Sequence, residues 1–422
     1  MKTLRIGLCG TGNVGYAFAE TIIKSNPLIK KNYGIDISLS MIGARKGKVP
    51  GLENIKVIKD IQEVPLSDEV DVVVELIGGV EESFKLAKVA LNNKKHFVTA
   101  NKALIAAHSK ELFEIAKQNQ VHLGFEASVA GGIPIIRVIR DGLMSNQINS
   151  FAGILNGTSN FIFSKMADEK LSFDTALALA QEEGFAEPDP TFDISGQDAA
   201  QKTSILATLS FFQNSSMENV YFEGIDNISP DDIDYGKQLN FVLKPLSVGM
   251  QNKNQVTLGS FPAFVKADSL LASIQNENNA VLVNTENVGG TMYSGPGAGA
   301  KPTANSVLSD IIDIARGKIF DYGKFVEKNL SSSFENFSCD RYLKLQVNDK
   351  PGVVAKISTL LANNNLSIDN LIQKELERSD SQIPLVIVLS NSNETTIQET
   401  IKNLEALDEV SGPLTHIRIL DI

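Results

Sequence analysis

Apolar residues in the first third of the chain form short runs separated by amphipathic segments. Five of these runs predict strands, at residues 4–9, 35–42, 70–76, 96–98 and 121–125. Three segments with the apolar spacing of helices alternate with them, at residues 14–23, 82–91 and 103–117. Strands alternating with helices are typical of βαβ units, whose parallel strands are joined by right-handed crossovers. The pattern therefore predicts a parallel sheet with helical connections over residues 1–135.

The rhythm changes after residue 135. Two helical stretches are predicted at 173–183 and 197–212, separated by a loop rich in acids and prolines. Alternating segments at 246–249, 256–258 and 280–285 predict strands. We therefore predict an α+β substrate-binding domain over 136–295. A helix at 303–316, after the glycine-rich turn at 294–300, is expected to return to the first domain, which would then comprise residues 1–135 plus 296–318.

The last part of the chain predicts a separate small module. Residues 319–339 are polar and include three consecutive serines, which is typical of a linker. Residues 340–422 show the order strand, helix, strand, strand, helix, strand, with the two helices at 353–363 and 394–407. The predicted fold class is therefore α/β, with a C-terminal βαββαβ domain.

Composition narrows the function classes. Of 422 residues, 39 are basic and 50 acidic, for a net charge of −11, which argues against nucleic-acid and anionic-membrane binding. No apolar run reaches the ~20 residues that span a bilayer, and the N-terminus lacks a signal-peptide pattern. Two distant cysteines, Cys9 and Cys339, form neither a disulfide framework nor a zinc site. A cytoplasmic protein is expected.

A glycine-rich motif follows the first predicted strand and opens the first helix. It consists of Gly10, Thr11, Gly12, Asn13, Val14 and Gly15 and fits G-x-G-x-x-G. In a βαβ context this pattern indicates a dinucleotide site, in which the glycines allow a tight turn, approach of a pyrophosphate and close helix packing. The helix N-terminus would face the phosphates with unpaired N–H groups.

The choice of dinucleotide depends on the end of the second strand. An acid there would bind the ribose hydroxyls of NAD, but Asp36 lies at the start of that strand. The end reads Gly43-Ala44-Arg45-Lys46, and Arg45 would suit the 2′-phosphate of NADP. The pattern favours NADP, with NAD as the alternative, and a solvated loop cation would also explain Arg45.

Acids and a lysine cluster in the middle of the chain. Asp198 and Lys202 are four residues apart on a predicted helix and share one face, and Glu187 lies just upstream between small residues and prolines. Two carboxylates could bind the ammonium and hydroxyl groups of an amino acid, and a lysine could transfer a proton. A surface ion pair is the alternative interpretation of Asp198 and Lys202.

Two loops follow later strands of the first domain. Thr99 and Lys102 come after the strand at 96–98, where the ligand crevice of a parallel sheet lies, so Lys102 is expected to point toward the nicotinamide. The loop Glu126–Pro134 combines a glutamate with glycine carbonyls that could hold a monovalent cation. A purely structural domain-crossing loop explains the same residues.

At these residues the sequence resembles homoserine dehydrogenases. The resemblance covers nearly the whole chain and rests on Gly10–Gly15, Thr99–Lys102 with Glu126–Pro134, Asn156–Asn160 and Gly184–Lys202. It implies NAD(P)-dependent interconversion of L-homoserine and L-aspartate 4-semialdehyde, a step of threonine, methionine and isoleucine synthesis. It also implies a homodimer or homotetramer built on the second domain.

Residue roles follow from this resemblance. Lys202 would be the proton donor and acceptor with Lys102 assisting, and Glu187 and Asp198 would bind substrate. Thr99, Lys102, Gly184 and Gly299 would contact the cofactor. A structural sodium ion would be held by Glu126, Val129, Gly131 and Ile133, mostly through carbonyl oxygens.

The C-terminal module resembles ACT domains through Val347–Val353, the loop between its first strand and first helix. This resemblance implies feedback regulation by an amino acid, with threonine the first candidate. A structural dimerisation module is the alternative.

Two rival functions are weighed against this one. An acylating aldehyde dehydrogenase needs a cysteine nucleophile at the nicotinamide, and neither Cys9, in the first strand, nor Cys339, in the predicted linker, suits that role. A non-catalytic sensor of NADP and an amino acid would not need Glu187, Asp198 and Lys202 together.

Overall fold

The computed structural model describes residues 3–45, 49–252, 255–320, 334–373 and 382–422. By their internal contacts the residues form two compact units. The first comprises residues 1–151, 200–219 and 279–330, and the second comprises 152–199, 220–278 and 331–422. These units group residues by packing, and the domain boundaries named above stay a prediction. Most of the predicted linker, and Lys46, lie outside the described residues.

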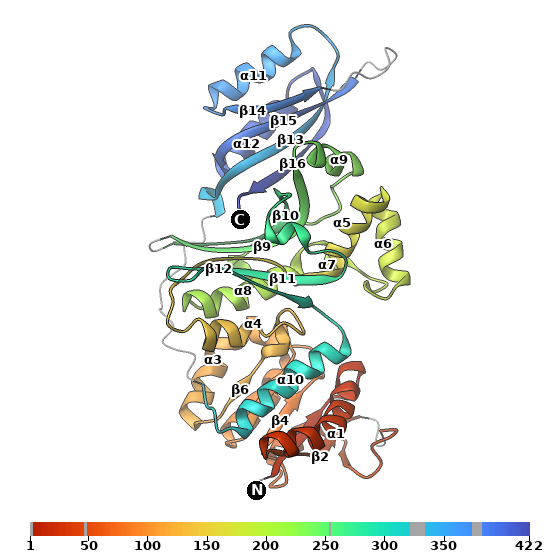
Figure 1. Cartoon of the computed structure of the whole chain (residues 1–422), viewed down its shortest axis with the longest axis vertical. Coiled ribbons are helices and arrows are strands. Elements are labelled where there is room, and N and C mark those ends of the chain that lie inside the picture. The colour runs from red at the N-terminus through yellow and green to blue at the C-terminus, as the bar shows by residue number, and fades with distance from the viewer. Residues whose placement is uncertain (1–2, 46–48, 253–254, 321–333, 374–381) are drawn as a thin grey trace. The chain divides into compact units, whose positions relative to one another are not determined.

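The first unit contains the predicted parallel sheet (Figure 1). Its strand order is β3 (Lys56–Ile58), β2 (Asp36–Gly43), β1 (Thr3–Cys9), β4 (Val72–Glu75), β5 (His96–Thr99) and β6 (Leu123–Gly124). All neighbouring pairs are parallel, and the order reverses between β1 and β4, as in doubly wound nucleotide-binding folds. The five predicted strands are confirmed. The three-residue β3, with an exposed lysine, is too short to show a pattern.

Helices α1 (Asn13–Tyr33), α2 (Glu81–Asn92) and α3 (Lys102–Asn119) connect these strands. The later helix α10 (Ala300–Ala315) packs on α1 and completes the core: its Val307 and Ile311 join Leu8, Phe18 and Ile22 in one buried cluster. The expectation that this helix returns to the first domain is therefore confirmed. The cluster matters for function because it anchors both sides of the glycine-rich motif.

Other elements of this unit follow the sheet in the chain. They are α4 (Ile135–Arg137), a short π-helix (Val138–Gly142), β11 (Asn278–Thr285) and β12 (Gly289–Pro296). Three elements begin in one unit and end in the other: β7 (Ile148–Ile154), α8 (Gln197–Phe211) and β11, whose first residue belongs to the second unit.

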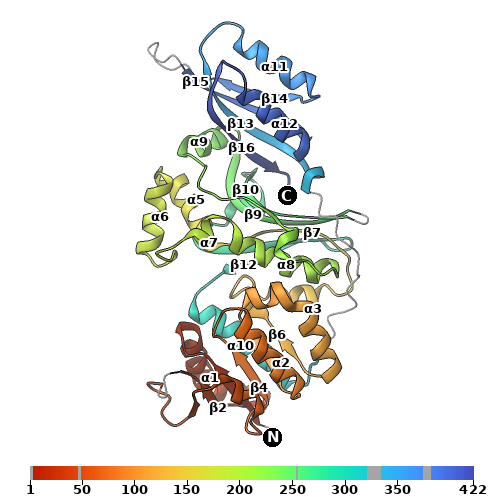
Figure 2. The ribbon, with the colours of Figure 1, turned by 180° about the vertical axis from the view of Figure 1, so that it is seen from behind.

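The second unit combines the acidic segment with the C-terminal module. Its middle part contains α5 (Gly157–Glu169), α6 (Phe173–Glu182), α7 (Thr191–Ile194), β8 (Tyr221–Phe222), α9 (Pro230–Gln238), β9 (Phe241–Asn252) and β10 (Gln255–Lys266). The C-terminal module consists of β13 (Ser338–Asn348), α11 (Val353–Asn363), β14 (Ile368–Gln373), β15 (Gln382–Asn393), α12 (Glu394–Glu405) and β16 (Val410–Leu420). The predicted βαββαβ order is confirmed, and Figure 2 shows α11 and α12 on one face of the module's sheet.

Two features of this module differ from expectation. Strand β13 begins at Ser338, so Cys339 lies in a strand and not in a linker, because the polar residues before the apolar run still pair with β15. In addition, β16 pairs in parallel with β10, and Ala263 lies opposite Arg418. The module therefore shares one sheet with the preceding segment, in the order β9-β10-β16-β13-β15-β14.

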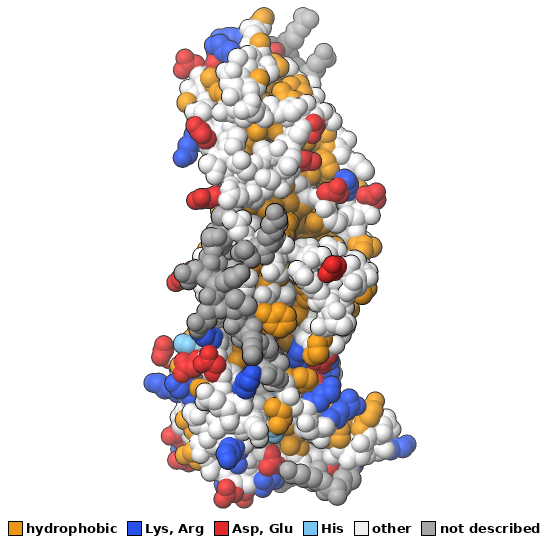
Figure 3. All heavy atoms as spheres, turned by 90° about the vertical axis from the view of Figure 1, so that its left-hand side faces the viewer, with side chains coloured by type: hydrophobic (Ala, Val, Ile, Leu, Met, Phe, Trp, Pro, Cys, Tyr) orange, Lys and Arg blue, Asp and Glu red, His pale blue; other side chains and the backbone are white. Residues whose placement is uncertain are grey.

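Among the described residues, no helix is both long and apolar enough to cross a membrane. On the face drawn in Figure 3, acidic and basic side chains are interspersed, with apolar side chains exposed between them.

Candidate active site

The glycine motif forms a turn between β1 and α1, called here the glycine turn (Gly10–Gly15). Gly10 has a φ of +102°, and a Cβ atom there would lie 2.5 Å from the carbonyl oxygen of Leu76. A Cβ atom at Gly15 would lie 2.2 Å from the carbonyl oxygen of Gly10. Both glycines are therefore required by packing within the protein.

Gly12 is required for a different reason. A Cβ atom at Gly12 would meet nothing within 4 Å, and its φ of −70° suits any residue. Gly12 is the N-cap of α1, which has no side-chain cap and no acidic residue in its first turn. The first N–H groups of the helix therefore face open space with a positive dipole end, the arrangement that binds a pyrophosphate. The glycine turn fits a dinucleotide.

The two residues considered for the choice of dinucleotide lie at opposite ends of β2, and the preference for NADP stays a prediction. Asp36 is the first residue of β2, and its carboxylate accepts hydrogen bonds from Thr3, Asn26 and Lys30. Its role is therefore structural. Arg45 lies two residues beyond the end of β2 with its side chain 90% exposed, and its nearest acid is Glu82 at 3.6 Å.

Lys102 is the first residue of α3, directly after β5. Thr99 Oγ1 donates a hydrogen bond of 2.6 Å to the Glu75 carboxylate and accepts one of 2.9 Å from the N–H of Asn101. Asn101 Oδ1 accepts from the N–H of Leu104 and so caps α3. Because β4 and β5 are parallel, these residues meet at the carboxyl edge of the sheet. The network holds the backbone that places Lys102 at this edge.

Glu75 is a positioning residue that the sequence pattern did not reveal. Its side chain is fully buried and also accepts hydrogen bonds from the N–H groups of Ile77 and Gly78. The signal for Glu75 in the sequence is its place in an otherwise apolar predicted strand. Buried parallel strands are mostly apolar, so an acid within one indicates a carboxylate with hydrogen-bond partners inside the protein.

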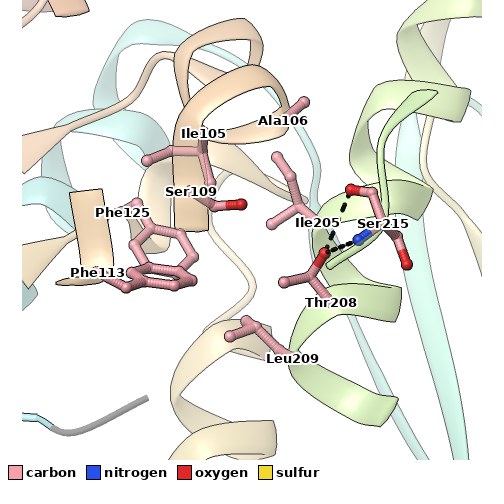
Figure 4. A pocket seen from close by; sticks show the side chains of 9 residues that line it. All are labelled: Ile105, Ala106, Ser109, Phe113, Phe125, Ile205, Thr208, Leu209 and Ser215. Carbon is pink, nitrogen blue, oxygen red and sulfur yellow. Dashed lines mark hydrogen bonds between the residues drawn. The ribbon is translucent and has the colours of Figure 1, made fainter. Parts of the chain in front are cut away.

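The helices that carry the two lysines pack together. Figure 4 shows Ile105 and Ser109 of α3 facing Ile205 and Leu209 of α8 across a narrow seam. Thr208 in this seam binds the backbone of Ser215 through its hydroxyl. The seam has about 190 Å³ of empty volume, part of it open to solvent, and is too narrow to hold a water molecule. We therefore assign it to packing rather than to ligand binding.

The acidic segment forms a second feature, called here the acid turn (Asp193–Asp198), which joins α7 to α8. Asn156 Nδ2 donates hydrogen bonds of 2.8 Å to Asp193 Oδ1 and to Asp198 Oδ2. Asn156 Oδ1 accepts from the N–H of Ser159 at 2.8 Å and caps α5. One amide thus brings both carboxylates of the turn together, and its own orientation is determined by the helix cap.

The predicted acids occupy different environments. Asp198 is only 4% exposed, whereas Glu187 is exposed after α6. Lys202 is half-buried in α8, one turn after Asp198. Because a solvated surface pair would expose its acid, the burial of Asp198 disfavours the surface ion-pair interpretation. Asn156 and Asp193 lie in segments that carry the family resemblance, but the sequence analysis gave neither a role, because an amide and an acid 37 residues apart show no common pattern.

Glu126 is buried in the loop after β6, where its carboxylate accepts hydrogen bonds of 2.9 Å from the N–H groups of Ile136 and Arg137. Its own N–H donates to Asp310 Oδ2 at 2.9 Å. Burial, together with the nearby Asp310 carboxylate, raises the pKa of Glu126 to about 8. Glu126 therefore supports the start of α4, as the domain-crossing interpretation of this loop requires.

The other predicted sodium ligands lie in the same loop. Val129 and Ile133 are buried, and the carbonyl oxygen of Gly131 accepts a 2.7 Å hydrogen bond from Ser306 Oγ. The described residues contain no cluster of three or more His, Cys, Asp or Glu side chains that could hold a metal. A cation here would therefore depend on backbone carbonyls.

Gly184 and Gly299 both adopt positive φ angles, +79° and +109°. Gly184 follows α6, and Gly299 is the N-cap of α10. Both are exposed, and their contact with a cofactor stays a prediction.

Neither cysteine suits covalent catalysis. Cys9 is fully buried, and burial raises the pKa of its thiol. Burial likewise raises the pKa of Cys339 to about 11. A nucleophilic cysteine needs a lowered pKa and access to substrate, so an acylating dehydrogenase is disfavoured.

Comparison with known proteins agrees with this geometry. The family model described as "Homoserine dehydrogenase, NAD binding domain" matches residues 10–126, the model "Homoserine dehydrogenase" matches 134–312, and the model "ACT domain" matches 341–408. A curated homoserine dehydrogenase of Pseudomonas aeruginosa is 39% identical over 99% of both chains. The chain belongs to the homoserine dehydrogenase family. It is an oxidoreductase that acts on a CH–OH group with NAD(P).

Solved homoserine dehydrogenases share the fold. The crystal structure of the enzyme from Thiobacillus denitrificans has a TM-score of 0.92 and 35% identity, covering 100% of this chain and 99% of that one. A hyperthermophilic archaeal homoserine dehydrogenase in complex with NADPH has a TM-score of 0.65 and 25% identity, covering 77% of this chain and 100% of that one.

Proposed function

We propose that this homoserine dehydrogenase interconverts L-homoserine and L-aspartate 4-semialdehyde, with Lys202 as the proton donor and acceptor and Lys102 assisting. Glu187 and Asp198 bind the substrate. The observation that carries the proposal is the buried Asp198, held by Asn156 one helical turn before Lys202.

The chain's own groups supply three acts in the reduction. Asp198 and Glu187 bind the amino acid part of the substrate and orient it. The Lys202 ammonium stabilises the negative charge that develops on the aldehyde oxygen and donates the proton to that oxygen. In the reverse direction the neutral amine removes the hydroxyl proton. The dinucleotide, when bound at the glycine turn, supplies the hydride.

We further propose NADP as the preferred cofactor. Support comes from Arg45 beyond β2, from the structural role of Asp36, and from the NADPH complex of the archaeal relative. An arginine at this position can pair with a 2′-phosphate, which NAD lacks. Thr99, Lys102, Gly184 and Gly299 complete the proposed contacts.

A structural sodium ion belongs to the same proposal, with Glu126, Val129, Gly131 and Ile133 as ligands. The oxygens of Glu126 and Gly131 already accept hydrogen bonds, but each has a further lone pair, so the donor set fits a hard monovalent cation. The ion would screen the buried Glu126 and Asp310 carboxylates from each other.

We also propose that the ACT domain binds a regulatory amino acid, with threonine as the first candidate, and that the step serves threonine, methionine and isoleucine synthesis. A homodimer or homotetramer in the cytoplasm is part of this proposal, in keeping with two free thiols. Kinetics with and without threonine test the regulatory part, and an unchanged rate would favour a structural module.

The catalytic assignment is tested with Lys202→Ala, assayed by NADPH oxidation on addition of aspartate semialdehyde. Loss of a general acid is expected to lower turnover about 10²- to 10⁴-fold. NADPH binding, followed by fluorescence titration, is expected to persist. Lys24→Ala, a change on an exposed face of α1, is the matched control. Near-normal turnover of Lys202→Ala would remove the assignment.

A further inference from the structure

An arginine of the ACT domain is buried against the segment that precedes it in the fold. Arg418 on β16 is fully buried, and its guanidinium binds both carboxylate oxygens of Glu223, at 2.8 and 3.0 Å. It also binds the carboxylate of Glu394 at 2.6 Å, and Glu394 pairs in addition with the buried Arg341 at 2.8 Å. Two arginines and two glutamates thus balance in charge inside the second unit.

Packing holds this cluster in one geometry. β16 runs parallel to β10, and the guanidinium carbon of Arg418 lies 4.4 Å from the ring centre of Phe261 and 5.1 Å from that of Phe334. The contact with Glu223 is bidentate: two guanidinium nitrogens bind the two carboxylate oxygens, the geometry that suits arginine best. The Glu223 carboxylate is therefore held by Arg418 of the ACT domain together with the neighbouring Tyr221 hydroxyl, which also donates to it.

The backbone of Glu223 packs directly on the acid turn. Gly196 has a φ of +86°, and a Cβ atom there would lie 2.6 Å from the carbonyl oxygen of Glu223. Two residues later, the N–H of Ile225 donates a 2.9 Å hydrogen bond to the carbonyl oxygen of Ile194. A shift of the Glu223 segment would therefore displace residues 194–196.

Both ends of that turn carry acids. Asp193 precedes residues 194–196 and Asp198 follows them, and Asn156 binds both carboxylates. The contacts from Arg418 to Asp198 are thus continuous. They consist of a salt bridge, a backbone contact, and the six-residue acid turn, whose two end carboxylates both bind the Asn156 amide.

We propose that Glu223, held by Arg418, is a positioning residue for Asp198, so that the ACT domain contributes to the geometry of the substrate site. The proposal rests on the proposed role of Asp198 as a substrate ligand. The pairing of β16 with β10 places Arg418 next to Glu223. A rearrangement of the ACT domain would therefore move or release Glu223 and so change the geometry of the acid turn. Removing the Glu223 charge would leave two buried arginines, Arg341 and Arg418, sharing the Glu394 carboxylate.

The test is Glu223→Gln, which keeps the shape of the side chain and removes its charge. KM for aspartate semialdehyde is expected to rise about three- to tenfold, within the range reported for coupled positions. KM for NADPH is expected to stay unchanged, because the glycine turn belongs to the first unit. Asp198→Asn, measured alongside, tests the assignment of Asp198 as a substrate ligand. An unchanged substrate KM in this variant would refute that assignment and with it the proposed substrate site.

Asp232→Asn is the matched control. Asp232 is a fully buried carboxylate that also joins the preceding segment to the ACT domain, through Lys344 at 2.8 Å and Tyr342 at 3.1 Å. This variant is expected to lower thermal stability and leave the substrate KM unchanged. If Glu223→Gln and Asp232→Asn raise the substrate KM equally, the effect is general destabilisation and the proposal fails.

Gly224→Ala keeps the test valid should Glu223→Gln not fold. A Cβ atom there would lie 2.9 Å from Asp226 Oδ1, which can rotate away, and 3.2 Å from the backbone carbonyl oxygen of Ile194. The methyl group therefore presses on the acid turn without removing either partner of the Glu223–Arg418 ion pair. A raised substrate KM with unchanged NADPH affinity supports the proposal. Wild-type kinetics in a folded Gly224→Ala variant, or in a folded Glu223→Gln variant with Asp198→Asn impaired, would overturn it.

Discussion

Alanine at Gly12 separates dinucleotide recognition from folding, because this glycine faces open space. Its φ of −70° suits alanine, and the added methyl group meets no protein atom within 4 Å. The free energy of unfolding is expected to change by less than about 1 kcal/mol, since the reduced entropy of the unfolded chain offsets the poorer N-cap. The methyl group would, however, occupy the space where a pyrophosphate approaches the helix N-terminus.

Gly15→Ala provides the contrast within the same turn. Its methyl carbon would lie 2.2 Å from the carbonyl oxygen of Gly10, about 1 Å inside ordinary contact, so α1 must move away from the turn. Overpacking of this kind costs about 1–3 kcal/mol, and a backbone neighbour places the cost at the upper end.

The assay pairs thermal unfolding with fluorescence titration of NADPH. Gly12→Ala is expected to keep the wild-type Tm and to raise Kd about tenfold or more, or about 1.4 kcal/mol. Gly15→Ala is expected to lower Tm by several degrees before any ligand is added. Wild-type affinity in Gly12→Ala would refute the placement of the pyrophosphate at the glycine turn, and a wild-type Tm in Gly15→Ala would refute the packing argument.

Three further predictions concern other parts of the molecule. Arg45→Gln is expected to raise KM for NADPH about tenfold and leave KM for NADH unchanged in steady-state kinetics; an equal effect on both would contradict the 2′-phosphate role. Asn156→Ala removes the α5 cap and one partner of the Asp198 carboxylate. It is expected to lower the free energy of unfolding, measured by urea titration, by about 1–3 kcal/mol and to raise the substrate KM. Wild-type values of both quantities would contradict this role of Asn156. Burial and the Arg140 charge lower the pKa of His122 to about 3, so the folded state loses about 1.4 kcal/mol per pH unit as pH falls from about 6.5 to 3. His122→Phe is expected to reduce the slope measured in pH-dependent unfolding, and the buried His416, whose pKa is also lowered by burial, accounts for a remaining slope. An unchanged slope would show that His122 does not contribute.

Local patterns in the sequence were sufficient for the nucleotide-binding part. Strand and helix periods recur within a few residues, and the roles of Gly10, Gly12 and Gly15 depend on one turn between adjacent elements. The end of β2, with Arg45 beyond it, is likewise a local feature. For these reasons the parallel sheet and the glycine turn could be predicted before any coordinates.

Tertiary structure alone decided how the acids are held. Asn156, Asp193 and Asp198 meet because α5 and the acid turn pack together, and Glu223 meets Arg418 across 195 residues of chain. The pairing of β16 with β10, which merges two predicted modules into one sheet, has no pattern of its own because each strand alone shows only its apolar period. Hydrophobic patterning reports which side of an element is buried, whereas the identity of its neighbour is set by packing of the whole chain.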